Sequence, residues 1–196
     1  MTSFNKKTIS NALNKKTREA ISDIHILNSV TSTNDVVLSE IKSHPTKTIA
    51  VFAEEQTQGR GRLGRTWISP PHSNIYLSLS WHFQQPILQL LDLSIVIAKI
   101  IIQALKKYGI TQTIEIKYPN DLIFENKKWG GILIETVNHQ PRSCSAVIGI
   151  GLNVNFSSEK TDKIDQPWTS LSEITQSKHD RNLMCACLLN ALCEAL

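Results

Sequence analysis

Hydrophobic and polar positions follow two different patterns in the first half of the chain. Residues 75–83 alternate strictly, which places on one face Ile75, Leu77, Leu79, Trp81 and Phe83. A period of two is typical of a strand, so we expect this segment to have one buried side and one side in solvent. Residues 48–55 form a nearly continuous apolar run instead and predict a buried strand.

The second half of the chain predicts four further strands, at 113–117, 121–126, 127–137 and 144–154. The corner Glu125-Asn126-Lys127 indicates a hairpin, and a looser turn is expected near Pro141. Hairpins join antiparallel neighbours. We therefore expect an α+β fold with a mixed, largely antiparallel sheet flanked by helices.

Three segments have helical patterns. Ser32 to Asn34 are residues that cap helices, and a short helix is expected to follow them to about residue 43. Residues 87–105 are apolar enough to pass for a membrane span, but Asp92, Lys99 and Gln103 form a narrow polar stripe. We interpret this segment as a helix buried against a sheet, because charges at the centre of a bilayer are costly. Residues 180–196 predict an amphipathic helix that runs to the last residue.

The N-terminal segment looks different from the rest. Residues 1–24 are polar and predict one short helix, and we expect them to be poorly anchored. They also lack the apolar core of a secretory signal. We therefore divide the chain into this segment and one domain over 25–196.

Composition narrows the class of protein. The chain has 196 residues, 41% of them hydrophobic, and a net charge of +4. This suits one globular domain and an anionic ligand, and does not by itself imply nucleic acid. Three of the four cysteines lie within nine residues, on the last predicted helix. We interpret them as reduced thiols of a cytoplasmic protein, since Cys185 and Cys187 do not have the spacing of a zinc site.

The loop between the first two strands carries the strongest chemical signal. Its residues 59–67 read GRGRLGRTW, with three arginines among three glycines. Glycine lets a backbone close around a ligand, and the guanidinium group of arginine matches phosphate and carboxylate. The glycine spacing fits the dinucleotide fingerprint, but no helix follows it, so we reject that interpretation. A nucleic-acid-binding segment and a solvated basic turn remain as alternatives.

Three other motifs contribute further lysines and glycines that could line the same site as the loop. KYPND at 117–121 offers Lys117 before a turn, KKWGGILIE at 127–135 offers Lys128 near Gly131, and GIGLNVN at 149–155 ends a strand. Each alone has an ordinary structural explanation, such as a bulge or a close packing contact. Together they favour a site for a small molecule that carries phosphate.

With STN at 32–34, these motifs resemble those of the biotin protein ligases, in the same order and over most of the chain. That family usually has tryptophan in place of Tyr118. The resemblance implies a fold akin to class II aminoacyl-tRNA synthetases. It also implies a ligase that forms biotinyl-5'-AMP from biotin and ATP with Mg²⁺. The biotinyl group then passes to a lysine of the biotin carboxyl carrier protein of acetyl-CoA carboxylase.

The resemblance also assigns roles. Arg62 and Lys128 are expected to act in catalysis, beside the biotin carboxylate and the α-phosphate. Biotin is expected to meet Ser32, Thr33, Asn34, Gln56, Gly59, Arg60, Arg62, Lys128, Gly131 and Gly149. The backbone at Gly59, Gly131 and Gly149 is expected to let biotin approach closely. ATP or the adenylate is expected to meet Arg62, Arg65, Trp67, Lys117, Asn120 and Asn153, with Trp67 stacked on the adenine. Asp121 is the expected metal ligand.

The sequence departs from the family pattern in two ways that bear on which partners we expect the protein to bind. Some members carry an N-terminal winged helix, which 24 residues cannot supply, so we expect no binding to nucleic acid and none to membranes. The SH3-like C-terminal domain of the family is expected to be absent. The protein could be a monomer or a homodimer. The alternatives are a lipoate or octanoate ligase on the related fold, or a biotin-binding protein without turnover.

Overall fold

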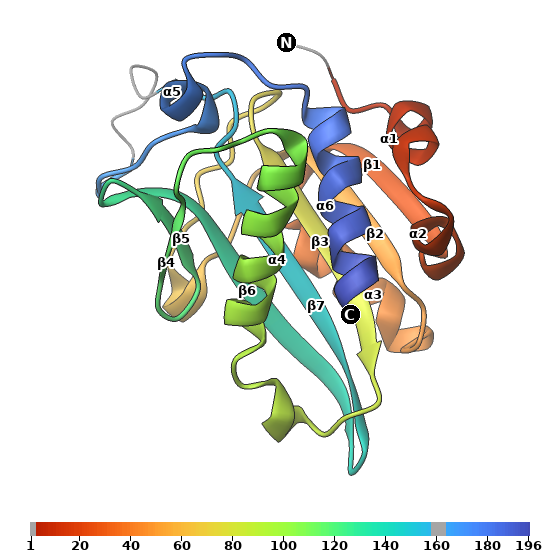
Figure 1. Ribbon diagram of the computed structural model, residues 1–196. Helices are drawn as coiled ribbons and strands as arrows, with labels where there is room; N and C mark the ends of the chain where they lie inside the picture. The colour runs from red at the N-terminus through yellow and green to blue at the C-terminus, as the bar shows by residue number, and fades with distance from the viewer. Residues whose placement is uncertain (1–2, 158–163) are drawn as a thin grey trace.

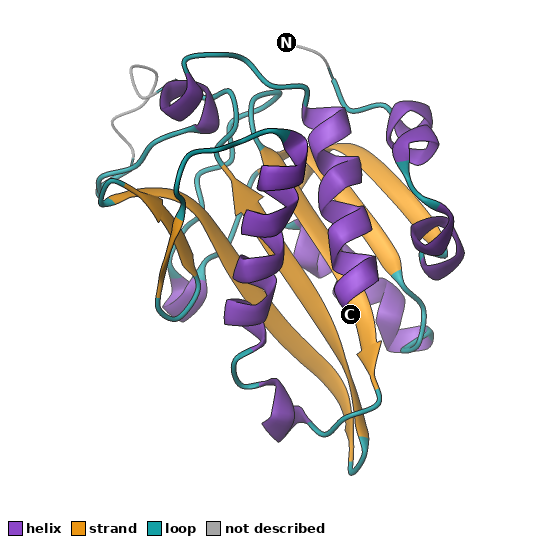
Figure 2. Cartoon of the chain, in the orientation of Figure 1, coloured by secondary structure: helices purple, strands orange, loops and turns teal. Residues whose placement is uncertain are grey.

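The computed structural model describes residues 3–157 and 164–196, except for the side chains of 138 and 139. One seven-stranded sheet runs through it in the order β1-β2-β3-β7-β6-β5-β4 (Figures 1 and 2). β1 and β2 are parallel and every other neighbouring pair is antiparallel. The expected α+β class with a mixed, largely antiparallel sheet is confirmed. The strands are β1 (Asp23–Val30), β2 (Ile49–Gln56), β3 (Ile75–Phe83), β4 (Glu115–Lys117), β5 (Asp121–Phe124), β6 (Lys127–Gln140) and β7 (Ser143–Leu152).

Helices cover both faces of the sheet. α4 (Leu93–Tyr108) and α6 (Arg181–Ala195) lie side by side on one face, and α3 (Thr33–Ser43) lies on the other (Figure 1). The main core lies under α4 and α6, and a smaller cluster around Val37, Ile41 and Val147 lies under α3. The remaining helical segments are α1 (Lys6–Ala12), α2 (Lys15–Ala20), η1 (Arg62–Gly64), η2 (Ile87–Leu90) and α5 (Leu171–Thr175).

The expectation that β3 has one side in solvent is wrong. Its serines Ser78 and Ser80 are buried, because α3 packs against that face. The Ser80 hydroxyl donates to the carbonyl of Lys47 at 2.7 Å and accepts from the amide of Ile49 at 2.8 Å. Polar residues in an alternating strand can therefore be buried when their hydroxyls find partners.

The N-terminal segment is not poorly anchored. Residues 3–24 form two helices rather than one, and both pack against α6. Phe4, Ile9 and Leu13 are buried, and the amide of Asn14 donates to Asn190 at 2.9 Å. Three widely spaced apolar residues were too sparse to predict this packing from the sequence.

Two helices also differ from expectation. The apolar segment at 87–105 begins with the short η2. α4 proper starts at Leu93 and ends at Tyr108, and it is capped by Gly109, whose φ is 101°. Its polar residues Lys99 and Gln103 are exposed as predicted, and no helix in the described ranges is long and apolar enough to cross a membrane. α6 is not amphipathic, because the sheet, α4 and the N-terminal helices enclose it on most sides.

Candidate functional site

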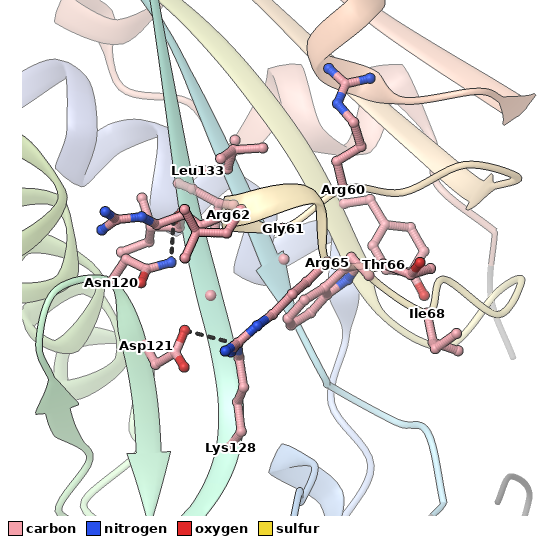
Figure 3. Close-up of a pocket in the computed structure, with 18 of the residues that line it drawn as sticks. Arg60, Gly61, Arg62, Arg65, Thr66, Ile68, Asn120, Asp121, Lys128 and Leu133 are labelled. Carbon is pink, nitrogen blue, oxygen red and sulfur yellow. Dashed lines mark hydrogen bonds and ion pairs between the residues drawn. The ribbon is translucent and has the colours of Figure 1, made fainter. Parts of the chain in front are cut away.

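One cleft of about 1150 Å³ gathers nearly all the residues that the motifs singled out (Figure 3). It lies where β6 and β7 meet the 59–67 loop, the start of α3 and the turn between β4 and β5. Among the predicted residues, the lining contains Ser32, Thr33, Asn34, Gln56, Arg60, Arg62, Arg65, Trp67, Lys117, Asn120, Asp121, Lys128, Gly131, Gly149 and Asn153. Gly59 is not part of the lining. A Cβ there would lie 2.5 Å from the carbonyl oxygen of Trp67, so Gly59 serves the packing of the loop itself.

The start of α3 forms a buried polar wall. Gln56 Oε1 accepts from the amide of Thr33 at 2.9 Å and from its hydroxyl at 3.1 Å. Ser78 Oγ, on β3, lies 2.7 Å from Thr33 Oγ1 and 2.5 Å from Asn34 Oδ1. These bonds fix the orientation of both side chains before any ligand arrives. The wall can therefore present donors and acceptors at fixed positions.

Glycines in β7 and β6 admit side chains of this chain. A Cβ on Gly149 would lie 2.4 Å from Asn34 Oδ1, and one on Gly151 would lie 2.6 Å from Trp67 Cε2. Gly131 stands opposite Gly151 in the sheet, and a Cβ on it would lie 3.3 Å from the same indole. The prediction that Gly59, Gly131 and Gly149 leave room for biotin missed these contacts, because each close approach involves a protein atom.

The 59–67 loop is a short closed turn. Its stem is held by the amide of Trp67 donating to Gly59 at 2.8 Å and that of Gly61 donating to Arg65 at 2.7 Å. At the tip, Leu63 has a left-handed backbone with φ of 56° and is 91% exposed. Arg62 and Arg65 are exposed and extend over the cleft in Figure 3. Within the described ranges, neither has an acidic partner within salt-bridge distance.

Arg60 behaves differently from its two neighbours. Its guanidinium lies 2.7 Å from Asp35 on α3 and 3.3 Å from Glu135 on β6. The hydrogen bond with Asp35 is the main cause that raises the pKa of Arg60. In Figure 3 it points away from the pair formed by Lys128 and Asp121. The structure thus separates Arg60 from the cations that face the cleft.

Lys128 and Asp121 form a partly buried ion pair at 2.8 Å across β5 and β6. The ammonium group also lies 5.5 Å from the centre of the Trp67 ring, within the range of a cation–π contact. Lys117 is exposed, and Asn120 Nδ2 donates to the carbonyl of Ile132 at 2.9 Å. A bound anion can therefore draw on Lys128 only in competition with Asp121.

The indole of Trp67 and the side-chain amide of Asn153 complete the site. The indole nitrogen of Trp67 is buried and finds no hydrogen-bond partner within the described residues. Asn153 has both ends engaged, since its Nδ2 donates to the carbonyl of Thr169 at 3.2 Å and its Oδ1 accepts from Asn74 at 3.4 Å. The predicted contact of the Asn153 side chain with adenine would have to replace one of these bonds.

Several lining or supporting residues were missed from the sequence. Ser78 and Glu135 hold predicted residues in place, and Tyr118, Asp165 and Trp168 line the cleft. Glu135 ends the motif at 127–135 and Tyr118 lies within KYPND, so both could have been found there. Trp168 lies outside all motifs. In the described ranges, no group of three or more His, Cys, Asp or Glu residues could hold a metal ion. Asp121 lines the cleft, but it is not part of a full set of protein ligands there.

Comparison with known proteins gives a consistent result. The pattern of the "Biotin/lipoate A/B protein ligase family" matches residues 26–153. The chain is 35% identical over 176 residues to the bifunctional ligase/repressor BirA of Escherichia coli strain K12, covering 88% of this chain and 53% of BirA. It is 31% identical over 147 residues to a biotin–[acetyl-CoA-carboxylase] ligase of Mycobacterium tuberculosis, covering 74% and 52% of the two chains. The chain thus spans about half the length of these relatives.

A solved structure supports the same assignment. The biotin protein ligase of Aquifex aeolicus in complex with biotin and ATP superposes with a TM-score of 0.70 at 30% identity. The match covers 89% of this chain and 70% of that protein.

Proposed function

The chain belongs to the biotin/lipoate A/B protein ligase family, and we propose that it is a biotin protein ligase. In this proposal it joins biotin to ATP as biotinyl-5'-AMP and passes the biotinyl group to a lysine of the biotin carboxyl carrier protein of acetyl-CoA carboxylase. One observation carries the proposal. Arg62 and Arg65, which have no acidic partner among the described residues, and Lys128 face a cleft that has a wall of fixed amide and hydroxyl groups.

The first step needs cations. An oxygen of the biotin carboxylate attacks the α-phosphorus of ATP, and the bond from that phosphorus to the bridging oxygen breaks to release pyrophosphate. Carboxylate and phosphate repel each other, so fixed positive groups must offset their charges as they meet. Arg62 and Lys128 are the groups we assign to this role, and Arg65 and Lys117 are assigned to the remaining phosphates. The second step needs no nucleophile from the enzyme, because the carrier lysine attacks the acyl carbon and AMP leaves.

The wall at α3 suits the head group of biotin. A ureido ring presents two donors and one acceptor, and Ser32, Thr33, Asn34 and Gln56 offer matching groups. Trp67 is assigned to stack on the adenine, where its broad face supplies contact area. Its position on Gly151 is already fixed, which lowers the cost of ordering it.

Magnesium fits the acidic residues present. Mg²⁺ in nucleotide sites is usually held by one or two carboxylates together with phosphates, and Asp121 beside the cleft offers one carboxylate. The ion would neutralise phosphate charge during adenylation. Release of Asp121 from Lys128 would also leave that ammonium group free for the substrate anions.

The remaining parts of the proposal concern the setting of the enzyme. We propose a cytoplasmic monomer or homodimer, and the free cysteines Cys144, Cys185, Cys187 and Cys193 suit a reducing compartment. A second candidate is a lipoate or octanoate ligase, because the family includes lipoate ligases. A biotin-binding protein without turnover is the third, and Arg62 and Arg65, exposed at the cleft, disfavour it because they suit the phosphates of ATP.

The test is ATP–pyrophosphate exchange with biotin, octanoate or lipoate as the acid. We expect exchange with biotin only. Lys128→Ala and Arg62→Ala should each lower its rate by roughly 100- to 1000-fold, the usual cost of removing one group that stabilises a developing charge. Lys99→Ala, at an exposed position on α4, is the matched control and should keep full activity. Exchange with octanoate or lipoate alone would replace the proposal with the second candidate, and binding of biotin without exchange would replace it with the third.

A further inference from the structure

Arg60 is held by two carboxylates that come from different elements. Its Nη1 donates to Asp35 Oδ2 at 2.7 Å, and its Nη2 lies 3.3 Å from Glu135 Oε2 and 3.4 Å from Oε1. One positive charge thus faces two negative ones. A phosphate or carboxylate ligand would add a third, so this guanidinium is poorly suited to bind substrate directly.

Because Arg60 lies in the stem of the 59–67 loop, its contacts with Asp35 and Glu135 hold that stem in place. Arg60 pairs with Thr66 across the stem of the 59–67 loop, and the next amide along the chain, that of Gly61, donates to Arg65. Arg62 follows only two residues later. Holding the Arg60 side chain to α3 and β6 therefore fixes the stem from which Arg62 extends over the cleft (Figure 3).

Glu135 links this stem to the polar wall. Its Oε2 accepts from Asn34 Nδ2 at 2.6 Å as well as from Arg60. The opposite end of the Asn34 amide is fixed by Ser78, and Gly149 leaves the space in which Asn34 lies. Because a carboxylate accepts only, Asn34 must turn its amino group toward Glu135. One carboxylate therefore orients a residue of the proposed biotin wall and also holds the loop.

We infer that Asp35 and Glu135 are positioning residues, which act through Arg60 to hold the arginine loop closed over the cleft. Arg60 itself serves as the anchor of the loop rather than as a ligand for biotin or phosphate. The inference rests on the proposed function where it concerns the adenylate. The pairs are partly exposed, with side-chain exposures of 36% for Arg60, 42% for Asp35 and 31% for Glu135. Such pairs are individually weak, so the anchor can open to admit substrate and close again.

The test uses Asp35→Asn and Glu135→Gln, with Glu40→Gln as the matched control on the exposed side of α3. In the ligand-free protein, we measure the rate at which trypsin cuts after Arg62 and Arg65. Loss of one half of the anchor should raise this rate about fivefold, while the control stays at the wild-type rate. The double variant Asp35→Asn/Arg60→Gln should be cut no faster than Arg60→Gln alone, because Asp35 acts only through Arg60.

The second measurement is the rate at which preformed biotinyl-AMP leaves the enzyme. This rate does not depend on the fraction of protein that is folded, so a general loss of stability would not change it. We expect both variants to release the adenylate about fivefold faster, and Asp35→Glu, which keeps the charge, to restore slow release. Unchanged release in both variants, or equal effects of Asp35→Asn with and without Arg60, would overturn the inference.

The two proposals fail in different ways. If the wild-type protein forms no biotinyl-AMP, the proposed function is wrong, and the trypsin series in the ligand-free protein still decides the anchor. If the wild type forms the adenylate and the variants match it in both cleavage and release, the anchor alone is wrong.

Discussion

The two sides of the cleft are built in opposite ways. The floor, formed by β6, β7 and the start of α3, is buried, and its polar groups are bonded to one another. The arginine loop, residues 59–67, is mostly exposed and is closed mainly by backbone bonds in its stem. Arg62 and Arg65 extend from it without acidic partners in the described ranges.

This contrast suggests that the floor recognises the ligand and that the arginine loop closes over it. On the floor, the space beside Gly149 and Gly151 is already occupied by Asn34 and Trp67, so the shape there is set before binding. In the loop, Arg62 and Arg65 have no acidic partner among the described residues, so a bound anion would give them one. An exposed loop above recognition groups that are already in place would suit an intermediate that must be shielded from water. Four predictions test the contrast, from the largest effect to the smallest.

Arg181→Met should cause the largest loss of stability, because it breaks an ion pair that is buried in the core. Arg181 lies 2.9 Å from Glu54, both side chains are at most 2% exposed, and it also donates to the carbonyl of Asn74 at 2.9 Å. Removing one partner leaves a buried charge, which costs about 3–5 kcal/mol in the free energy of unfolding. Chemical denaturation measures this, with Lys99→Met as the control. A loss below about 1 kcal/mol would mean that the buried core does not depend on this pair.

Arg62→Ala should separate activity from stability. We expect a loss of about 2.7–4 kcal/mol in transition-state stabilisation, since the group would meet a developing charge. The free energy of unfolding should stay within about 0.5 kcal/mol of the wild type, because the side chain is exposed. Exchange kinetics and denaturation on the same samples give both numbers. A marked loss of stability would show that the loop is part of the packed structure.

Gly151→Ala and Gly61→Ala compare the two regions directly. A Cβ at position 151 would lie 2.6 Å from the Trp67 ring, whereas at 61 its nearest neighbour lies 3.5 Å away. Overpacking typically costs about 1–3 kcal/mol, so the first variant should lose that much stability and also displace Trp67. The second should change stability by less than about 0.5 kcal/mol. Equal effects would remove the distinction between floor and loop.

Leu63→Asn should have the smallest effect. Leu63 has φ of 56° and ψ of 33°, a left-handed conformation that asparagine tolerates better than leucine. We expect a gain of up to about 1 kcal/mol in the free energy of unfolding. Leu88→Asn, at another exposed leucine without a positive φ, controls for the loss of exposed apolar surface. An equal gain in both variants would show that the added stability comes from removing an exposed apolar side chain and not from relieving backbone strain.

Local patterns predicted much of the fold and of the site. The strands around 49–56, 75–83 and 127–152 and the hairpin at Glu125-Asn126 follow from apolar runs and turn residues, and both hairpin residues have positive φ. The motifs also predicted which residues would meet, and all except Gly59 line one cleft. Segments rich in glycine and cations can be recognised as parts of a binding site from the sequence alone. Glycine allows the backbone to come close to other groups, and arginine binds anions.

What each predicted residue does there was harder to read. Gly131 and Gly151 stand opposite each other because of the register of β6 against β7, and only that register makes the bare surface on which Trp67 lies. The sequence alone does not distinguish the roles of the three arginines in the loop, Arg60, Arg62 and Arg65. Asp35 and Glu135, which are distant in sequence, single out Arg60 as the anchor.

The sequence by itself indicated most of the strands, the two long helices, the composition of the cleft and the family to which the chain belongs, since these depend on residue type and spacing along the chain. Tertiary structure decided that α3 covers the serine face of β3, that α1 and α2 pack on α6, and that Asp35 and Glu135 hold one of the three arginines. Each of those outcomes depends on contacts between segments far apart in sequence, where burial and charge pairing outweigh local preference.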